Sequence, residues 1–202
     1  MRDMMDKLAR GETPPKLLRG EAVVWDREGP VPVRLKRSAE SQSDLDLLPP
    51  PARELVDPRY YERAGTDNIQ TKRGCAFHCT YCDYPDLEGR RVRVRNPVSI
   101  AEEFVERSKV PGVEFCFVVD SVFNVPPKHA LAVCNELIAR GSPLPWACYG
   151  TPAAFDDALV KAMVESGCKG VEIGTDSGNE RVLKRLRKPF TLDDVRRTRE
   201  LF

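Results

Sequence analysis

The stretch VEFCFVVDSVFNVPPKHALAVCNELIARG, Val113 to Gly141, has the pattern of a strand, a loop and a helix in series. Its first eight residues form an apolar run that ends in an aspartate, as buried parallel strands do. Pro127 suits the first turn of a helix, and Gly141 suits the left-handed residue that follows a helix end. Between them the apolar residues recur at helical spacing, at Ala130, Val133, Cys134, Leu137 and Ile138.

The same alternation of strand and helix runs through the chain from Asp67 to the end. The strand-like runs are Asn68 to Lys72, Val113 to Asp120, Leu144 to Gly150 and Lys169 to Thr175. The helix-like segments that follow them are Ser99 to Lys109, Pro126 to Gly141, Pro152 to Gly167 and Thr191 to Phe202. Four such pairs in series predict an α/β fold in which parallel strands are covered by helices.

Local signals mark the ends and faces of these helices. Ser99 and Glu102 have the spacing of a capping box, and Gly167 stands where the third helix should stop. The face of that third helix expected to pack on the sheet carries Ala158, Leu159, Ala162 and Met163.

Composition narrows the class of protein. The chain has 202 residues, 41% of them hydrophobic, and a formal net charge of +1, which allows a real core and shows no overall bias toward nucleic acid or an anionic membrane. The charged N-terminus has no apolar signal region, and no apolar run approaches the roughly eighteen residues of a membrane span. Seven cysteines, an odd number placed in apolar runs, suit a reducing compartment. We therefore expect a cytoplasmic protein.

The part before the first strand has a different composition. Residues 1–66 include the proline-rich and charged stretches ETPPKLLRG and LDLLPPPARELVDP, and we interpret them as a linker and the remnant of a preceding domain. Two strand-like pieces, Ala22 to Trp25 and Val31 to Leu35, could pair as a hairpin across the turn from Arg27 to Pro30. The domain proper is expected to span 67–202.

The loop after the first strand carries the chemistry. In RGCAFHCTYCDYP, Arg73 to Pro85, the spacing C-x3-C-x2-C of Cys75, Cys79 and Cys82 can turn three thiolates toward one iron-sulfur cluster. Three protein ligands leave the fourth iron of a cubane open to a small molecule with its own donor atoms. A structural zinc site completed by His78 or a distant cysteine is the alternative, although zinc ligands usually come as two separated pairs. The other four cysteines are interpreted as small core residues: Cys116, Cys134, Cys148 and Cys168.

With Tyr81 directly before the last of the three cysteines, this loop resembles that of the radical S-adenosylmethionine (radical SAM) enzymes. The resemblance covers roughly Asp67 to Phe202. It implies the first four strand-helix units of a partial (β/α) barrel and a [4Fe-4S] cluster whose open iron is chelated by SAM. Such enzymes cleave SAM reductively to a 5'-deoxyadenosyl radical, and an electron donor such as a flavodoxin or ferredoxin is implied.

The same resemblance assigns SAM contacts. Adenine is expected near Tyr81, and the amino group of SAM near Asp120, which follows the second strand. Asp120 lacks the family's common glycine-glycine-glutamate context and could equally be a turn residue. Asp176 and Ser177 match the family's ribose-contacting positions, which precede a VLK sequence and a lysine, although the segment from Thr175 to Gly178 could be only a helix-starting turn.

The linker phrase DLLPPPARELVD is similar to one in the B12-binding subgroup of radical SAM enzymes. This likeness implies a truncated piece of a longer enzyme that acts on a small molecule, with cobalamin bound only by the full-length protein. Two alternatives stay open: an RNA-modifying, methylthiotransferase-like radical SAM enzyme, and a zinc-stapled binding module without catalysis.

The arginines of GRRVRVRNP, Gly89 to Pro97, could suggest RNA binding. Their strict alternation with valines instead favours a short extended segment with its arginines in solvent, so nucleic acid is not the expected partner.

Overall fold

The computed structural model describes residues 21–25, 30–34 and 44–202. Its contacts divide the chain into two units, Met1–Gln42 and Ser43–Phe202. In the first unit β1 (Glu21–Trp25) pairs antiparallel with β2 (Pro30–Arg34), and Ala22 lies opposite Val33. These are the strands of the predicted hairpin; its turn and Leu35 lie outside the described residues.

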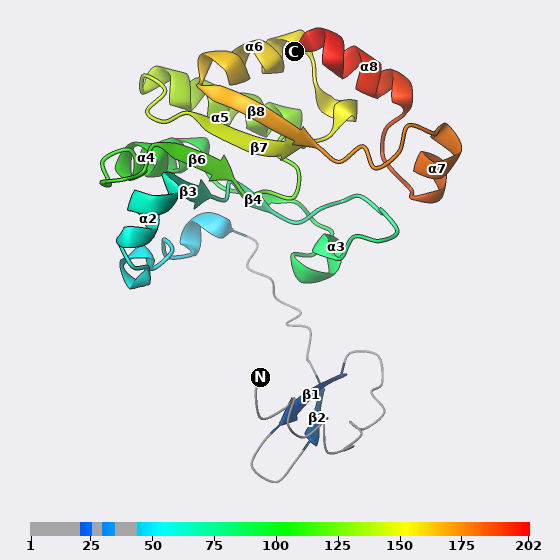
Figure 1. Cartoon of the computed structure of the whole chain (residues 1–202), viewed down its shortest axis with the longest axis horizontal. Coiled ribbons are helices and arrows are strands. Elements are labelled where there is room, and N and C mark those ends of the chain that lie inside the picture. Colours follow the sequence, from blue (N-terminus) through cyan, green and yellow to red (C-terminus); the bar gives the residue numbers. More distant parts are fainter. Residues whose placement is uncertain (1–20, 26–29, 35–43) are drawn as a thin grey trace. The chain divides into compact units, whose positions relative to one another are not determined.

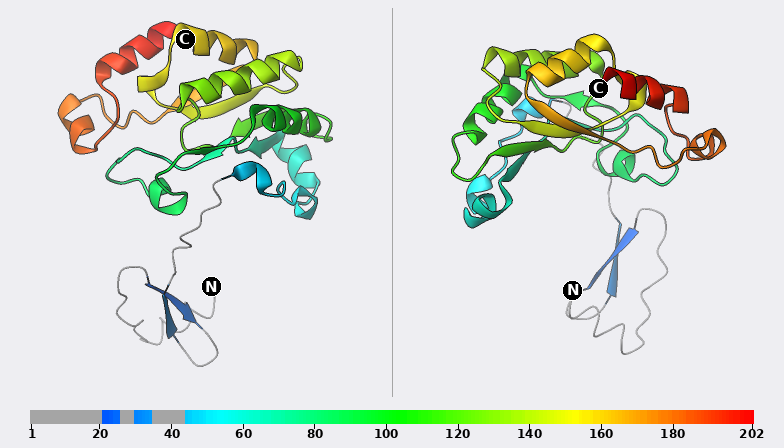
Figure 2. Two further views of the ribbon diagram at one scale, coloured as in Figure 1. Left: turned by 180° about the vertical axis from the view of Figure 1, so that it is seen from behind. Right: turned by 45° about the horizontal axis from the view of Figure 1, so that its top comes forward.

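The second unit contains a four-stranded parallel sheet. The strands are β3 (Thr66–Ile69), β6 (Phe115–Val118), β7 (Trp146–Gly150) and β8 (Cys168–Ile173), and they lie side by side in chain order. The helices that connect them are α4 (Pro97–Arg107), α5 (Pro127–Ala139) and α6 (Asp157–Glu165). Figures 1 and 2 show these helices on one face of the sheet, while the loop with α3 (Tyr84–Leu87) lies toward the other. The predicted alternation is confirmed.

The chain continues after β8 through α7 (Glu180–Arg185) to α8 (Leu192–Leu201). Asn179 caps α7 by accepting a hydrogen bond from the backbone N–H of Arg181 at 2.9 Å. A capping box between Thr191 and Asp194 starts α8. No helix in the described part of the chain is both long and apolar enough to cross a membrane.

The start of α4 differs from the prediction. Asn96 is the N-cap, since its side chain accepts a hydrogen bond from the N–H of Val98 at 2.9 Å, and Pro97 occupies the first helical position. The predicted capping box of Ser99 with Glu102 is wrong, because Ser99 already lies inside the first turn. The predicted helix ends are confirmed: Gly141 and Gly167 have φ of 76° and 93°.

The core lies between the sheet and its helices. Trp146 is fully buried, donates its indole N–H to the carbonyl of Ser166 at 3.0 Å, and meets the ring of Phe123 edge-on with 5.0 Å between centroids. The buried face of α6 differs from the predicted one at two residues, since Ala158 is exposed and Val160 is buried.

The cysteines outside the loop largely occupy the core as predicted. Cys116, Cys134 and Cys148 are fully buried, and Cys168 is half-buried against the same core. Burial raises the pKa of Cys134 to about 12 and raises that of Cys116 further. These thiols are therefore protonated and inert at neutral pH.

The predicted boundary near residue 66 is not where the structure divides. Residues 44–64 form the short helices η1 (Leu45–Leu47), η2 (Arg53–Leu55) and α2 (Arg59–Ala64). Arg53 of this segment lies 2.7 Å from Glu103 of α4 and donates to the carbonyl of Asn68 at 2.7 Å. Tyr61 belongs to the core. This part of the proposed linker is packed onto the α/β unit, and the division falls between Gln42 and Ser43.

A second small sheet closes the base of the cysteine loop, where β4 (Lys72–Arg73) pairs antiparallel with β5 (Arg93–Val94). The alternation in Gly89 to Pro97 is reversed at this strand: Arg93 is 8% exposed and Val94 is 41% exposed. Arg93 turns inward, and its guanidinium donates to the carbonyl of Glu88 at 2.5 Å. The prediction that the arginines face solvent is correct for Arg90 and Arg91 and wrong for Arg93 and for Arg95, which is half-buried and lies 2.7 Å from Glu103.

Candidate active site

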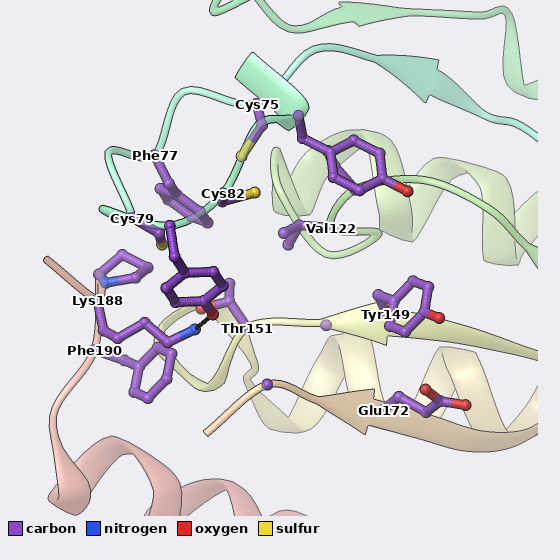
Figure 3. Close-up of a pocket in the computed structure, with 16 residues that line it drawn as sticks. Cys75, Phe77, Cys79, Cys82, Val122, Tyr149, Thr151, Glu172, Lys188 and Phe190 are labelled. Atoms are coloured by element: carbon purple, nitrogen blue, oxygen red, sulfur yellow. Dashed lines mark hydrogen bonds between the residues drawn. The ribbon is translucent and has the colours of Figure 1, made fainter. Parts of the chain in front are cut away.

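A cleft of about 280 Å³ opens at the carboxyl ends of the strands (Figure 3). It is lined by the cysteine loop, by the residues that follow β6, by the ends of β7 and β8, and by the segment after α7. This is the edge of a parallel α/β sheet where loops can vary without disturbing the core. The sequence predicted the site there.

All three cysteines of the loop line this cleft. Cys75, Cys79 and Cys82 are free thiols, and they come from one loop of eight residues. The donor set fits an iron-sulfur cluster, because soft thiolates in a short loop are the ligands that such clusters take.

Backbone contacts hold the loop in place. The N–H of Cys75 donates to the carbonyl of Gly89 at 3.0 Å, and that of Thr80 donates to the carbonyl of Leu186 at 3.0 Å. Gly74, with φ of 95°, has no room for a side chain, because a Cβ there would lie 2.2 Å from the carbonyl oxygen of Arg91. The loop is therefore shaped by the fold before any ligand binds.

The zinc alternative has less support. Among the described residues, no three His, Cys, Asp or Glu side chains converge closely enough to hold one metal ion. Thiolates of a cubane cluster bind different irons, so they do not need to converge on one atom. His78 is exposed, and its Nδ1 lies 3.0 Å from Nη1 of Arg90.

Two of the predicted SAM contacts, Tyr81 in the lining of the cleft and Asp176 outside it, are brought together. The hydroxyl of Tyr81 donates to Asp176 at 2.5 Å, and Nζ of Lys188 lies 2.5 Å from Asp176 and donates to the Tyr81 hydroxyl at 2.8 Å. We call this triad the clasp. It joins the cysteine loop to the segments that follow β8 and α7. Tyr81 is 95 residues away from Asp176 and 107 residues away from Lys188 in the sequence.

The electrostatics of the clasp are those of an ion pair. Burial alone raises the pKa of Asp176, but hydrogen bonds from Lys188 and Tyr81 hold that pKa below its ordinary value. Burial lowers the pKa of Lys188, and its bonds to Asp176 and Tyr81 outweigh this and raise it. Both groups are thus charged at neutral pH. The Lys188 side chain is only 7% exposed and its ammonium also lies over the Tyr81 ring, 5.2 Å from the centroid.

Asp120 lies behind the cleft and is fully buried. Its carboxylate accepts hydrogen bonds from the N–H groups of Thr71 and Lys72 at 2.7 and 3.1 Å, and from the Thr71 hydroxyl. The Lys72 ammonium lies 3.7 Å away and donates to the carbonyl of Phe123 at 2.5 Å. Burial raises the pKa of Asp120 and lowers that of Lys72 to about 8. Ser121 and Val122, its neighbours, line the cleft instead.

Ser177 is also outside the lining. Its N–H donates to the carbonyl of Thr175 at 2.7 Å, and its hydroxyl accepts from the N–H of Asn179 at 3.1 Å. Through these two hydrogen bonds Ser177 helps to form the turn that leads into α7. Asp176 beside it has φ of 58°, the left-handed conformation of a tight turn.

Sequence reasoning missed several residues of the cleft. Lys188 follows the VLK sequence but had no assigned role, Tyr149 on β7 was not singled out, and Glu172 on the acidic face of the fourth strand was given no role. Strand position was the available signal, since both lie near the carboxyl ends of predicted strands.

Residues 69–202 match the family model of the radical SAM superfamily. The chain belongs to this superfamily. Members use a [4Fe-4S] cluster and SAM, so the expected family and its cofactors are confirmed at that level.

Individual relatives within the superfamily include a methyltransferase. Over 127 residues the chain is 32% identical to the tryptophan 2-C-methyltransferase of Streptomyces laurentii, covering 58% of this chain and 21% of that protein. The structure is similar to that of TsrM, a radical SAM methyltransferase from Kitasatospora setae solved with tryptophan and a SAM analogue, with a TM-score of 0.71 at 23% identity over 98% of this chain and 41% of the other.

It is also similar to OxsB, a cobalamin-dependent SAM radical enzyme, with a TM-score of 0.69 at 18% identity over 99% of this chain and 30% of that one. At these identities the two structures show the fold, and the predicted partial barrel is confirmed. The chain spans between 21% and 41% of the length of these relatives.

Proposed function

We propose that this chain forms the SAM-cleaving core of a radical SAM enzyme. The observation that carries the proposal is the gathering of three free thiols from one preshaped loop on a single cleft at the strand ends. Cys75, Cys79 and Cys82 would hold the [4Fe-4S] cluster and leave one iron open for SAM. When bound and reduced, the cluster supplies the electron that cleaves the sulfonium of SAM to methionine and a 5'-deoxyadenosyl radical.

The chain's own residues bind and orient. The exposed ring of Tyr81 offers a surface for adenine, and Asp176, on the other side of the clasp, offers a carboxylate for the ribose hydroxyls. Asp120 would act indirectly in this scheme, since it anchors the backbone of Thr71 and Lys72 directly before the cysteine loop. Ser177 would shape the turn that presents Asp176.

The full reaction is proposed from the relatives. One is named a methyltransferase of tryptophan and one a cobalamin-dependent radical enzyme. We infer methyl transfer to a small molecule, with cobalamin bound by the whole protein. A flavodoxin- or ferredoxin-like donor would supply the electron. All seven cysteines are free, which supports a reducing compartment such as the cytoplasm. No contact among the described residues favours the RNA-modifying alternative over this proposal.

The test is anaerobic reconstitution with iron and sulfide, followed by reduction with dithionite in the presence of SAM. The expected products are 5'-deoxyadenosine and methionine, measured by chromatography. Cys82→Ser should abolish both the visible cluster absorption and the products, and the core variant Cys134→Ser should retain them. Equal iron content in the two variants would overturn the ligand assignment. A wild-type chain that holds the cluster but forms no 5'-deoxyadenosine would overturn the proposed activity of this chain.

A further inference from the structure

The open face of the sheet carries a carboxylate that the proposed chemistry does not use. Glu172 on β8 lines the cleft and is exposed, and its side chain makes no hydrogen bond or ion pair with any described residue. The other charged residue of the lining, Lys188, is already held by Asp176 at 2.5 Å. Glu172 is therefore the charged side chain of the lining that has no partner among the described residues.

Glu172 has an aromatic neighbour on the adjacent strand. In the parallel register Glu172 lies opposite Tyr149 of β7, and Gly170 lies opposite Ala147. The Tyr149 ring is 41% exposed and packs edge-on against Phe117 of β6, with 5.1 Å between centroids. Residues paired in register share a face, so the Tyr149 ring lies beside the Glu172 carboxylate, and Phe117 packs on Tyr149 from β6.

Tyr149 and Glu172 lie on the face of the sheet opposite the core. Trp146 and Cys148, which alternate with Ala147 and Tyr149 on β7, point toward the helices and are fully buried. Figure 3 shows Tyr149 and Glu172 at the end of the cleft away from Cys79 and Lys188. A molecule bound there would lie in the same cleft as the thiol loop without displacing the clasp.

We propose that Glu172 and Tyr149 form the substrate subsite, and that the substrate carries a cationic amino group beside an aromatic or other flat apolar body. This rests on the proposed function, whose substrate class it specifies. An ammonium would pair with the Glu172 carboxylate, and the aromatic side chains would cover the apolar body and the face of the cation. Glu172 is a specificity residue here, since it binds substrate and takes no part in bond cleavage.

The test uses two probes with the same ring and chain length, phenethylamine and phenethyl alcohol. The first carries a cationic ammonium group and the second a neutral hydroxyl group. Their dissociation constants are measured by ligand-observed NMR on the full chain, with and without the reconstituted cluster. The wild-type chain should bind the amine about tenfold more tightly than the alcohol, as a charge-assisted hydrogen bond allows. Glu172→Gln should lower amine affinity about tenfold and leave alcohol affinity unchanged.

Glu165→Gln is the matched control. Glu165 is an exposed glutamate on α6, on the helix-covered side of the sheet, so its variant should keep the amine preference. Tyr149→Leu should weaken both probes. Equal affinity of the wild type for both probes, an unchanged preference in Glu172→Gln, or an equal loss in Glu165→Gln would overturn the subsite. Retained amine preference in a wild-type chain that forms no 5'-deoxyadenosine would overturn the proposed function and support the subsite.

Discussion

Replacing Asp120 by asparagine should destabilise the fold strongly, although the side chain keeps its shape. Asp120 is fully buried and is the carboxylate partner of the equally buried Lys72, whose ammonium lies 3.7 Å away. The carboxylate also accepts two backbone N–H groups at the entry to the cysteine loop. An asparagine would leave Lys72 without a counter-charge, so the buried lysine would either stay charged without a partner or give up its proton. The NH2 group of the asparagine would also face at least one donor.

The size of the effect follows from these contacts. At 3.7 Å and an effective dielectric constant of about 20, the attraction between two unit charges is roughly 4 kcal/mol. Loss of one partner of a buried pair costs about 3–5 kcal/mol in measured systems. We therefore expect a loss of about 3–5 kcal/mol in the free energy of unfolding, a large part of the roughly 5–15 kcal/mol of a whole domain.

The assay is urea unfolding of the cluster-free chain under nitrogen, followed by circular dichroism. The double variant Asp120→Asn with Lys72→Met removes the unpaired charge, so it should recover stability through a coupling free energy of about 2 kcal/mol. Asp83→Asn, at an exposed aspartate of the loop, should change stability by less than about 0.5 kcal/mol. The reasoning fails if Asp120→Asn lies within about 1 kcal/mol of wild type, or if the two changes simply add.

Three further outcomes are expected. Alanine at any one of the three loop cysteines should prevent stable cluster assembly, while Cys134→Ala should leave iron content nearly unchanged; iron and sulfide analysis decides, and equal losses would contradict the assignment. Asp176→Ala should weaken SAM binding in an equilibrium titration without loss of iron. A variant that binds SAM with wild-type affinity would show that Asp176 only shapes the turn. Lys188→Met should destabilise the chain by about 1 kcal/mol after allowance for solvent screening.

The effect of Lys188→Met should depend on pH in a defined way. The folded pKa of Asp176 is lowered from 3.8, so the stabilisation by the ion pair is present above that value and is lost as pH falls through the lower folded pKa. The folded pKa of Lys188 is raised from 10.5, so the stabilisation is present below that value and is lost as pH rises through the higher folded pKa. Urea unfolding should show a constant difference from wild type between these limits, and a difference that varies across neutral pH would contradict the ion pair.

The fold could be predicted because its signals are local. Apolar runs, helical spacing, Pro127 and the glycines after the helices each lie within a few residues of the element they define, and chain order then implies parallel strands. The three cysteines were found for the same reason, since their spacing lies in one loop.

The arrangement of the site was less predictable because it depends on directions and distant contacts. Asp120 ends a predicted strand, but position alone does not tell whether a side chain points into the cleft or back to Thr71. The clasp joins Tyr81 to residues about a hundred positions away, which no periodicity reports. Arg93 is buried against the alternating pattern, and its guanidinium donates to the carbonyl of Glu88, a contact that the alternation does not predict.

The central claim is that the cleft holds a cluster with one iron open to SAM. The most direct test is the electron paramagnetic resonance spectrum of the reconstituted, dithionite-reduced chain, recorded with and without SAM. The account predicts the signal of a reduced [4Fe-4S] cluster whose line shape changes when SAM is added, because SAM would bind the iron that lacks a cysteine. A reduced cluster whose spectrum is the same with and without SAM would contradict it.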